Sequence, residues 1–313
     1  SFDWLRPRTS SDADPMSTTD PSTDLMREAV PERANPLGLT GIEFVEYVTE
    51  RPQALGQVLE SVGFQPVARH RSREVLLYRQ GSMNVVVNAH PDDTRVSHAD
   101  AGASPQLSAI AFRVHDAERA HRRSLDLGAW DVPTQARAME LVIPAIRGPG
   151  NTRFYFVDRW RDFSVFDIDF TPIPTVDQHP PALAGMDFFG VVQYIGAYRT
   201  DEWLAYFGRL FGFDVLPDNE RYGIMPKGTL LRSPCGRFLW QIVEPESLGD
   251  QLRGRECLQR VGLGVPDVPN AVALLRARGV EFVDAAENHP DDHGAITRPV
   301  LGGVTFELVH RTS

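Results

Sequence analysis

Glu307 is the acidic residue whose surroundings point most clearly to chemistry. It lies in residues 302–309 (Gly-Gly-Val-Thr-Phe-Glu-Leu-Val), where apolar side chains flank it on both sides. A carboxylate among apolar side chains holds a proton more readily than one in water, which makes it a candidate general acid–base catalyst. The sequence therefore predicts a functional site around Glu307.

Three other positions in the second half carry side chains that suit such a site. Arg260 lies in the segment 258–261 and has a planar guanidinium, which binds a carboxylate through two parallel hydrogen bonds. Gln241 lies on a predicted strand of the second half and carries a polar amide. His289 and His293 are four residues apart, but the proline and glycine beside them predict a loop, so the spacing does not put both rings on one helical face.

Composition excludes several classes of function. The chain has 313 residues and a formal net charge of -10, which disfavours binding to nucleic acid or an anionic membrane surface. It contains two cysteines and no zinc-type cysteine spacing, so we expect a cytoplasmic protein without a disulfide framework. No apolar run reaches the roughly 18–20 residues that span a bilayer. The nucleophile elbow, the P-loop and the Rossmann glycine motif are also absent from the sequence.

The elements that would position these residues follow a repeated pattern. Residues 42–48 alternate as a strand, 53–62 have helical spacing, and 65–70, 74–79 and 83–88 are three short strands. A second set comprises a strand at 107–114, a helix at 117–127, and strands near 139–143, 152–157 and 164–170. Each set is a strand, a helix and further strands.

The second half of the chain repeats the first. The predicted strand at 258–265 matches the one at 107–114 with an offset of 258 − 107 = 151, and the glycines that end the following helices are also 279 − 128 = 151 apart. Strands at 186–192 and a helix at 203–211 match the start of the first half. A repeat of this kind predicts a duplicated architecture. We expect a disordered tail at 1–35, a first domain at 36–174 and a second domain at 175–313, joined by a proline-rich linker.

Five segments resemble a known family. They are residues 35–39 (NPLGL), 41–46 (GIEFVE), 76–81 (LLYRQG), 156–159 (FVDR) and 166–170 (FDIDF). They resemble 4-hydroxyphenylpyruvate dioxygenases of the vicinal oxygen chelate superfamily. The resemblance implies an α+β fold in which four βαβββ units pair into two half-barrel domains. It also implies a structural first domain and a second domain that binds ferrous iron through two histidines and one glutamate.

The positions of the iron ligands depart from the family pattern. Glu307 matches the glutamate, whereas the first histidine position holds Phe188, or Gly190 if the alignment starts from the helix. Arg260 occupies the second histidine position. Phenylalanine and glycine offer no ligand atom and arginine is cationic, so the resemblance does not carry an iron site to this chain.

These residues predict a ligand site of altered chemistry in the second domain. The resemblance places Arg260 and Glu307 on neighbouring strands, where the guanidinium either pairs with Glu307 or binds a ligand carboxylate; Glu307 and Arg260 are the candidate catalytic residues. The candidate ligand-binding residues are Phe188, Gln241, Arg232 and Trp240. We expect a small aromatic or 2-oxo carboxylic acid as ligand and no metal cofactor.

Three functions remain open from the sequence. The first is a metal-independent enzyme of the isomerase, lyase or cyclase type. The second is an Fe(II)-dependent dioxygenase whose ligands lie elsewhere, with Gln241, His289 and His293 as candidates. The third is a protein that binds or sequesters a small molecule without turnover. The resemblance also leads us to expect a homodimer or homotetramer.

Overall fold

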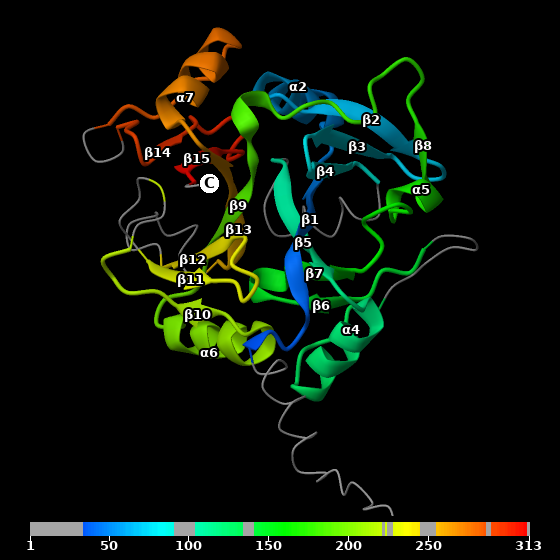
Figure 1. The fold of residues 1–313 in the computed structure, drawn as a ribbon, viewed down its shortest axis with the longest axis vertical. Helices are drawn as coiled ribbons and strands as arrows, with labels where there is room; N and C mark the ends of the chain where they lie inside the picture. The colour runs from blue at the N-terminus through cyan, green and yellow to red at the C-terminus, as the bar shows by residue number, and fades with distance from the viewer. Residues whose placement is uncertain are drawn as a thin grey trace, which may run out of the picture.

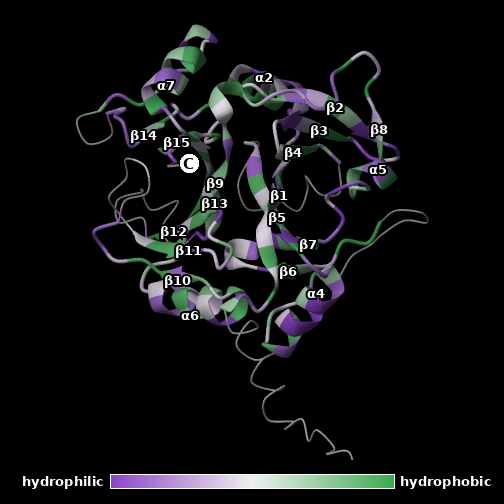
Figure 2. Cartoon of the chain, viewed as in Figure 1, coloured by the Kyte–Doolittle hydropathy of each residue, from purple (hydrophilic) through white to green (hydrophobic). Residues whose placement is uncertain are grey.

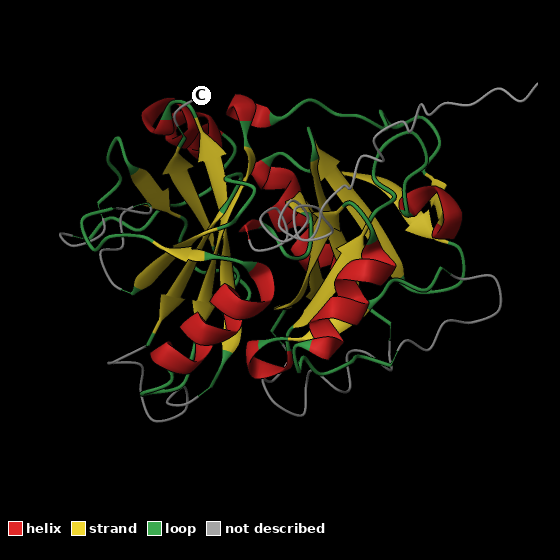
Figure 3. Ribbon diagram, turned by 60° about the horizontal axis from the view of Figure 1, so that its bottom comes forward, coloured by secondary structure: helices red, strands yellow, loops and turns green. Residues whose placement is uncertain are grey.

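The computed structural model describes residues 34–90, 104–133, 141–220, 223, 228–244, 255–285 and 289–311. Two mixed sheets lie side by side, each with its longer helices on one face (Figures 1 and 3). Most of the predicted tail at 1–35 lies outside the described residues. Sheet membership changes between Pro172 and Asp187, an interval that includes the predicted domain boundary at 174.

The first sheet has eight strands in the order β6-β7-β5-β1-β4-β3-β2-β8. Its elements are β1 Leu39–Val48, α2 Pro52–Val62, β2 Gln65–His70, β3 Val75–Gln80, β4 Met83–Asn88, β5 Gln106–Val114, α4 Ala117–Asp126, β6 Ala145–Arg147, β7 Arg153–Val157, α5 Phe166–Asp169 and β8 Phe170–Pro172. The short 3-10 helices η1 Pro149–Asn151 and η2 Leu183–Gly185 lie before β7 and before the second sheet.

The second sheet has seven strands in the order β10-β11-β12-β9-β13-β15-β14. Its elements are β9 Asp187–Tyr194, α6 Thr200–Phe211, β10 Asp214–Val215, β11 Thr229–Arg232, β12 Leu239–Val243, β13 Cys257–Val265, α7 Val268–Ala277, β14 Gly294–Ile296 and β15 Phe306–His310. If β9 is matched to β1 and β13 to β5, the strand order is that of the first sheet without β8. The predicted α+β duplication is confirmed.

Helix signals repeat with the same offset as the strands. The Asp116 carboxylate caps α4 by accepting from the backbone N–H of Arg119, and Asp267 caps α7 in the same way from Asn270. The two caps are 267 − 116 = 151 residues apart. α2 ends at Gly63, whose positive φ of 109° favours glycine. Local sequence therefore sets where these helices begin or end.

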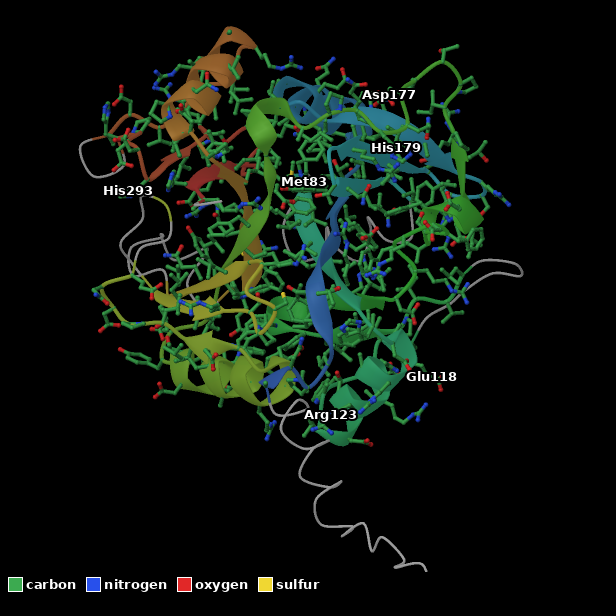
Figure 4. The ribbon with its side chains drawn as sticks, in the orientation of Figure 1. Met83, Glu118, Arg123, Asp177, His179 and His293 are labelled. Carbon is green, nitrogen blue, oxygen red and sulfur yellow. The ribbon has the colours of Figure 1, made fainter. Side chains whose placement is uncertain are left out.

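The helix-bearing faces of the two sheets share one apolar cluster. The Phe112 ring on β5 lies 5.4 Å from the Phe211 ring of α6 and 5.8 Å from the Phe238 ring. Figure 2 shows apolar residues along the strands at the centre of the molecule, and Figure 4 places Met83 there. We call the opposite faces of the sheets the first cup and the second cup. Each cup has its own smaller apolar cluster, which includes Phe44 in the first and Val192 in the second.

Two predicted strands of the first domain are wrong in place or type. Residues 164–170 form the short helix α5 and the start of β8, because the Ser164 hydroxyl accepts from the Phe166 N–H and Asp167 accepts from the Ser164 N–H. Such local side-chain bonds compete with an extended strand. The strand expected near 139–143 is β6, which begins after Pro144; residues 139 and 140 lie outside the described residues.

A helix that crosses a bilayer needs about 20 consecutive, mostly apolar residues. Within the described ranges, no helix combines the length and the hydrophobicity that such a span requires.

Candidate ligand-binding site

A row of side chains crosses the second cup from β12 to β15. Gln241 on β12 is paired with Val192 on β9, and Val192 is paired with Arg260 on β13. Glu307 lies two residues before Val309, a member of the second-cup cluster, and strand alternation puts both on the cup face. The structure therefore brings together three of the predicted residues: Gln241, Arg260 and Glu307.

Arg260 and Glu307 form a fully buried ion pair. The Arg260 Nε donates to Glu307 Oε2 at 2.7 Å, and the side chains are 2% and 0% exposed. Arg260 Nη1 also donates to Gln259 Oε1 at 2.6 Å. The pairing predicted from the sequence is present, and the positive charge lies directly against the carboxylate. Each charge compensates the other in a region of low dielectric constant.

Tyr194 is a further polar residue on the cup side of β9. Burial raises the pKa of its hydroxyl, while a hydrogen bond from Arg260 opposes that rise. The phenol therefore stays protonated at neutral pH and serves as a hydrogen-bonding group beside the guanidinium. Sequence reasoning missed Tyr194 as a site residue, although it lies two positions after Val192 and alternation places it on the same face.

The backbone of Gly223 lies against Glu307 Oε1, the carboxylate oxygen that does not accept from Arg260 Nε. A Cβ atom added to Gly223 would fall 2.0 Å from Glu307 Oε1, and Gly223 has a φ of +57°. A Cβ added to Gly294 would fall 2.9 Å from the Cα of Gly223. Gly223 thus requires glycine for its backbone to approach the carboxylate this closely, and Gly294 requires glycine for its backbone to approach Gly223.

Two predicted ligand-binding residues do not face the second cup. Trp240 is fully buried in the shared apolar cluster, with its ring 5.1 Å from that of Phe207. Phe188 belongs to the same cluster and pairs with Leu263, on the helix-bearing side. The β9–β13 pairing shifts register next to this pair, between Gly262 and Leu263, so simple alternation fails there. A Cβ added to Gly264 would lie 2.8 Å from the Cβ of Phe189, which packs with the second-cup cluster instead.

Arg232 lies at the rim of the second cup. It ends β11 opposite Leu239, which packs with the second-cup cluster, and its side chain is exposed. Its Nη2 lies 3.5 Å from Glu220 Oε1, at the limit of a hydrogen bond. Arg232 is therefore exposed at the edge of the cup, whereas Arg260 and Glu307 are buried.

The histidine pair lies away from this row. His289 Nδ1 is 2.5 Å from Asp284 Oδ1, and both side chains are largely exposed. His293 is exposed and lies at the edge of the molecule (Figure 4). In the described part of the chain, no three His, Cys, Asp or Glu side chains gather closely enough to hold a metal ion. The structure thus does not bring His289 or His293 to Glu307.

Comparisons with known proteins give the context of this site. Residues 33–171 match the family model described as hydroxyphenylpyruvate dioxygenase, HPPD, N-terminal. A 4-hydroxyphenylpyruvate dioxygenase of Pseudomonas sp. (strain P.J. 874) is 38% identical over 80% of this chain and 73% of its own. Hemolysin VllY of Vibrio vulnificus is 32% identical over 82% and 75%. A solved mutant of 4-hydroxymandelate synthase from Streptomyces coelicolor has a TM-score of 0.69 and 17% identity, over 88% of this chain and 94% of that one, which shows the common fold.

Proposed function

The chain belongs to the 4-hydroxyphenylpyruvate dioxygenase family of the vicinal oxygen chelate superfamily, and we propose that it is a metal-independent member that binds a small aromatic or 2-oxo carboxylic acid in its second cup. One observation carries the proposal: the buried Arg260–Glu307 ion pair lies where the family pattern places two of the three iron ligands.

The residues of the second cup do not fit ferrous iron. Such a site needs two neutral nitrogen ligands beside the carboxylate. Arg260 instead puts a positive charge 2.7 Å from Glu307. A divalent cation at the carboxylate would be repelled by this guanidinium, which is charged at any working pH. The side chain of Phe188 packs in the shared apolar cluster and has no ligand atom.

The same residues suit a carboxylate ligand. Arg260, Tyr194 and Gln241 provide polar groups beside Glu307, among the apolar side chains of Val192, Leu230 and Val309. Small-molecule sites commonly combine an apolar lining with a few polar groups of this kind.

The proposed position of the ligand ring is over two glycines of the second cup. Gly190 and Gly262 are paired on the adjacent strands β9 and β13, and neither carries a side chain. A flat ligand can lie over such a floor with its carboxylate toward Arg260, while Arg232 meets it at the rim.

Metal content tests the metal-independent part of the proposal. Purified protein is incubated anaerobically with ferrous iron, desalted and analysed by mass spectrometry for iron and other transition metals. We expect far less than one metal per chain. A content of about one iron per chain, together with oxygen uptake on addition of a 2-oxo acid, would contradict the proposal and restore an iron dioxygenase.

A titration tests whether the second cup binds a carboxylic acid. Calorimetric titration uses phenylpyruvate, benzoate and pyruvate as probes, with the double variant R260M/E307L and the first-domain variant R153M as matched control. The double variant removes both charges of the second cup, so it is expected to fold and to lose the binding event that depends on the second cup. Equal affinity in the double variant and the wild type would reject the site.

The fate of the bound probe distinguishes two kinds of protein. Mass spectrometry of the probe after incubation shows conversion if the protein is a metal-independent enzyme and unchanged probe if it is a binding protein. The proposed Glu307 acid–base role predicts conversion that E307Q abolishes. The cytoplasmic location and self-association expected from the sequence stay predictions.

A further inference from the structure

The first cup contains a cavity that the proposed function does not use. It has a volume of about 210 Å³ and lies between β2, β3 and the segment 166–178 that follows the second unit. Its lining residues are Ala68, Arg71, Leu77, Arg79, Phe166, Asp167, Phe170, Thr171, Pro172 and Gln178. Figure 4 shows Asp177 and His179, on either side of Gln178, over the β2–β3 part of the sheet.

Arg79 is held rigidly at the wall of this cavity. Its Nε donates to Asn84 Oδ1 at 2.7 Å and its Nη1 donates to the Gln178 carbonyl at 2.9 Å. The guanidinium carbon lies 5.9 Å from the centre of the Phe166 ring. A guanidinium fixed in this way loses little conformational freedom when its remaining N–H groups bind an anion.

Arg71 provides a second positive charge. Its backbone N–H donates to the Asp169 carbonyl, while its side chain is exposed and makes no hydrogen bond or ion pair to the described residues. The charged residues of the lining are Arg71, Arg79 and Asp167, so the formal balance is 2 − 1 = +1. Asp167 already accepts from the Ser164 N–H at 2.7 Å. The cavity is therefore complementary to a single negative charge.

The remaining walls are apolar. Phe166 and Phe170 pack edge to face with ring centres 5.6 Å apart, and both belong to or pack against the first-cup cluster. Leu77 and Ala68 line the sheet side. The volume is below the roughly 300–1,000 Å³ of sites for drug-sized molecules, so the cavity suits a smaller molecule.

From this arrangement we propose that the first cup is a second ligand site, which binds a small monocarboxylate with an apolar ring. The carboxylate lies between Arg71 and Arg79, and the ring lies against Phe166 and Phe170. The site is independent of the second cup, because it shares no residue with the Arg260–Glu307 row.

The test is titration of 4-fluorobenzoate, followed by its ¹⁹F NMR signal, against the full chain. For wild type we expect a dissociation constant on the order of 1 mM, as for other ligands of this size. Two variants attack the site: R71Q removes an exposed charge, and T171W fills the cavity from its rim. R71Q should bind at least roughly tenfold more weakly, since a hydrogen bond to a charged group is worth about that factor. T171W should show a loss of similar size because its indole occupies the space of the ligand ring. Thermal melts confirm that each variant is folded.

Three matched control variants show whether the binding event belongs to the first cup. R122Q removes an exposed arginine of α4, T171V keeps the β8 edge without filling the cavity, and R260M/E307L removes the charges of the second cup. All three should retain this binding event.

The proposal is overturned if R71Q and T171W bind like wild type, if wild type does not bind, or if R260M/E307L alone loses the signal. That last result would place the ligand in the second cup and leave the proposed function standing. The proposal would also be overturned if acetate displaced 4-fluorobenzoate as effectively as benzoate does, because the ring would then contribute nothing to the affinity.

Discussion

Besides the Glu43–Arg113 pair of the first cup, each cup holds a buried carboxylate paired with an arginine across its sheet. These two pairs share one strand of the repeated unit, because β7 corresponds to β15, and differ in the other strand. In the first cup Glu46 on β1 lies 3.2 Å from Arg153 on β7. In the second cup Arg260 on β13 lies 2.7 Å from Glu307 on β15. The counterpart of Arg260 in the first cup, 260 − 151 = 109, is Ala109, which pairs with Glu46. The counterpart of Glu46 is Val192, which pairs with Arg260.

The two pairs also differ in their access to solvent. Arg153 is 25% exposed and Glu46 is 7% exposed, whereas Arg260 and Glu307 are 2% and 0% exposed. Glu46 has a further partner, since Asn88 Nδ2 donates to it at 2.9 Å. The duplicated scaffold thus sets the strand order but leaves the position and solvation of charges free to vary. Two pairs of the same chemical type should then contribute very differently to stability.

The largest expected effect is the loss of one partner from the second-cup pair. R260M removes the guanidinium from the fully buried Glu307 carboxylate, which should lower the free energy of unfolding by about 3–5 kcal/mol. The double variant R260M/E307L removes both charges and should unfold close to wild type. Urea denaturation of the two single variants, R260M and E307L, and of the double variant measures the coupling.

The expected coupling would be contradicted if the stability losses of R260M and E307L simply added in the double variant. Such additivity would mean that Arg260 and Glu307 are not energetically paired, and that the difference in burial between the cups has no consequence.

A second effect, of about 2 kcal/mol, concerns Glu43 in the first cup. Burial raises the pKa of Glu43 from 4.5 to about 6, although the Arg113 guanidinium beside it lowers that value. The folded state therefore binds a proton more tightly than the unfolded state, and stability falls as the pH rises through the window from 4.5 to 6. The shift of 6 − 4.5 = 1.5 corresponds to about 2 kcal/mol.

Urea denaturation of wild type and E43Q at pH 4.5 and pH 7 tests this linkage. Glutamine does not titrate, so the stability of wild type relative to E43Q should fall by about 2 kcal/mol between the two pH values. A difference that is constant with pH would show that Glu43 ionises normally, and that the first cup is as well solvated there as the exposed surface.

The fold was largely predictable because its signals are local and repeated. Helical periodicity, the glycine stops and the offset of 151 indicate the same βαβββ unit in both halves, and tertiary packing agrees with them. The segment 164–170 was missed because Ser164 and Asp167 bond to nearby backbone, a preference that the apolar pattern of the segment does not reveal.

The site was only partly predictable. Arg260, Glu307 and Gln241 lie together as expected, but Trp240 and Gln241 are adjacent on β12 and so point to opposite faces. Strand alternation alone therefore shows that Trp240 and Gln241 cannot both face the second cup. The orientation of Phe188 depends on the register shift beside Leu263. This shift arises from the pairing of β9 with β13 and cannot be predicted from the sequence of either strand alone. The charged cavity of the first cup depends on segments about 100 residues apart, such as Arg79 and Gln178, and no sequence motif signals it.

The smallest expected effect is the counterpart of the first prediction in the other cup. R153M makes the same substitution as R260M, but it should lower the free energy of unfolding by only about 1 kcal/mol. Arg153 is partly solvated, and Glu46 keeps its hydrogen bond from Asn88 when the arginine is gone. Urea denaturation of R153M and R260M under identical conditions measures the two losses in the free energy of unfolding, and so their ratio. If the two variants lose equal stability, solvent access does not decide the energetics of the pairs, and the cups differ in position alone.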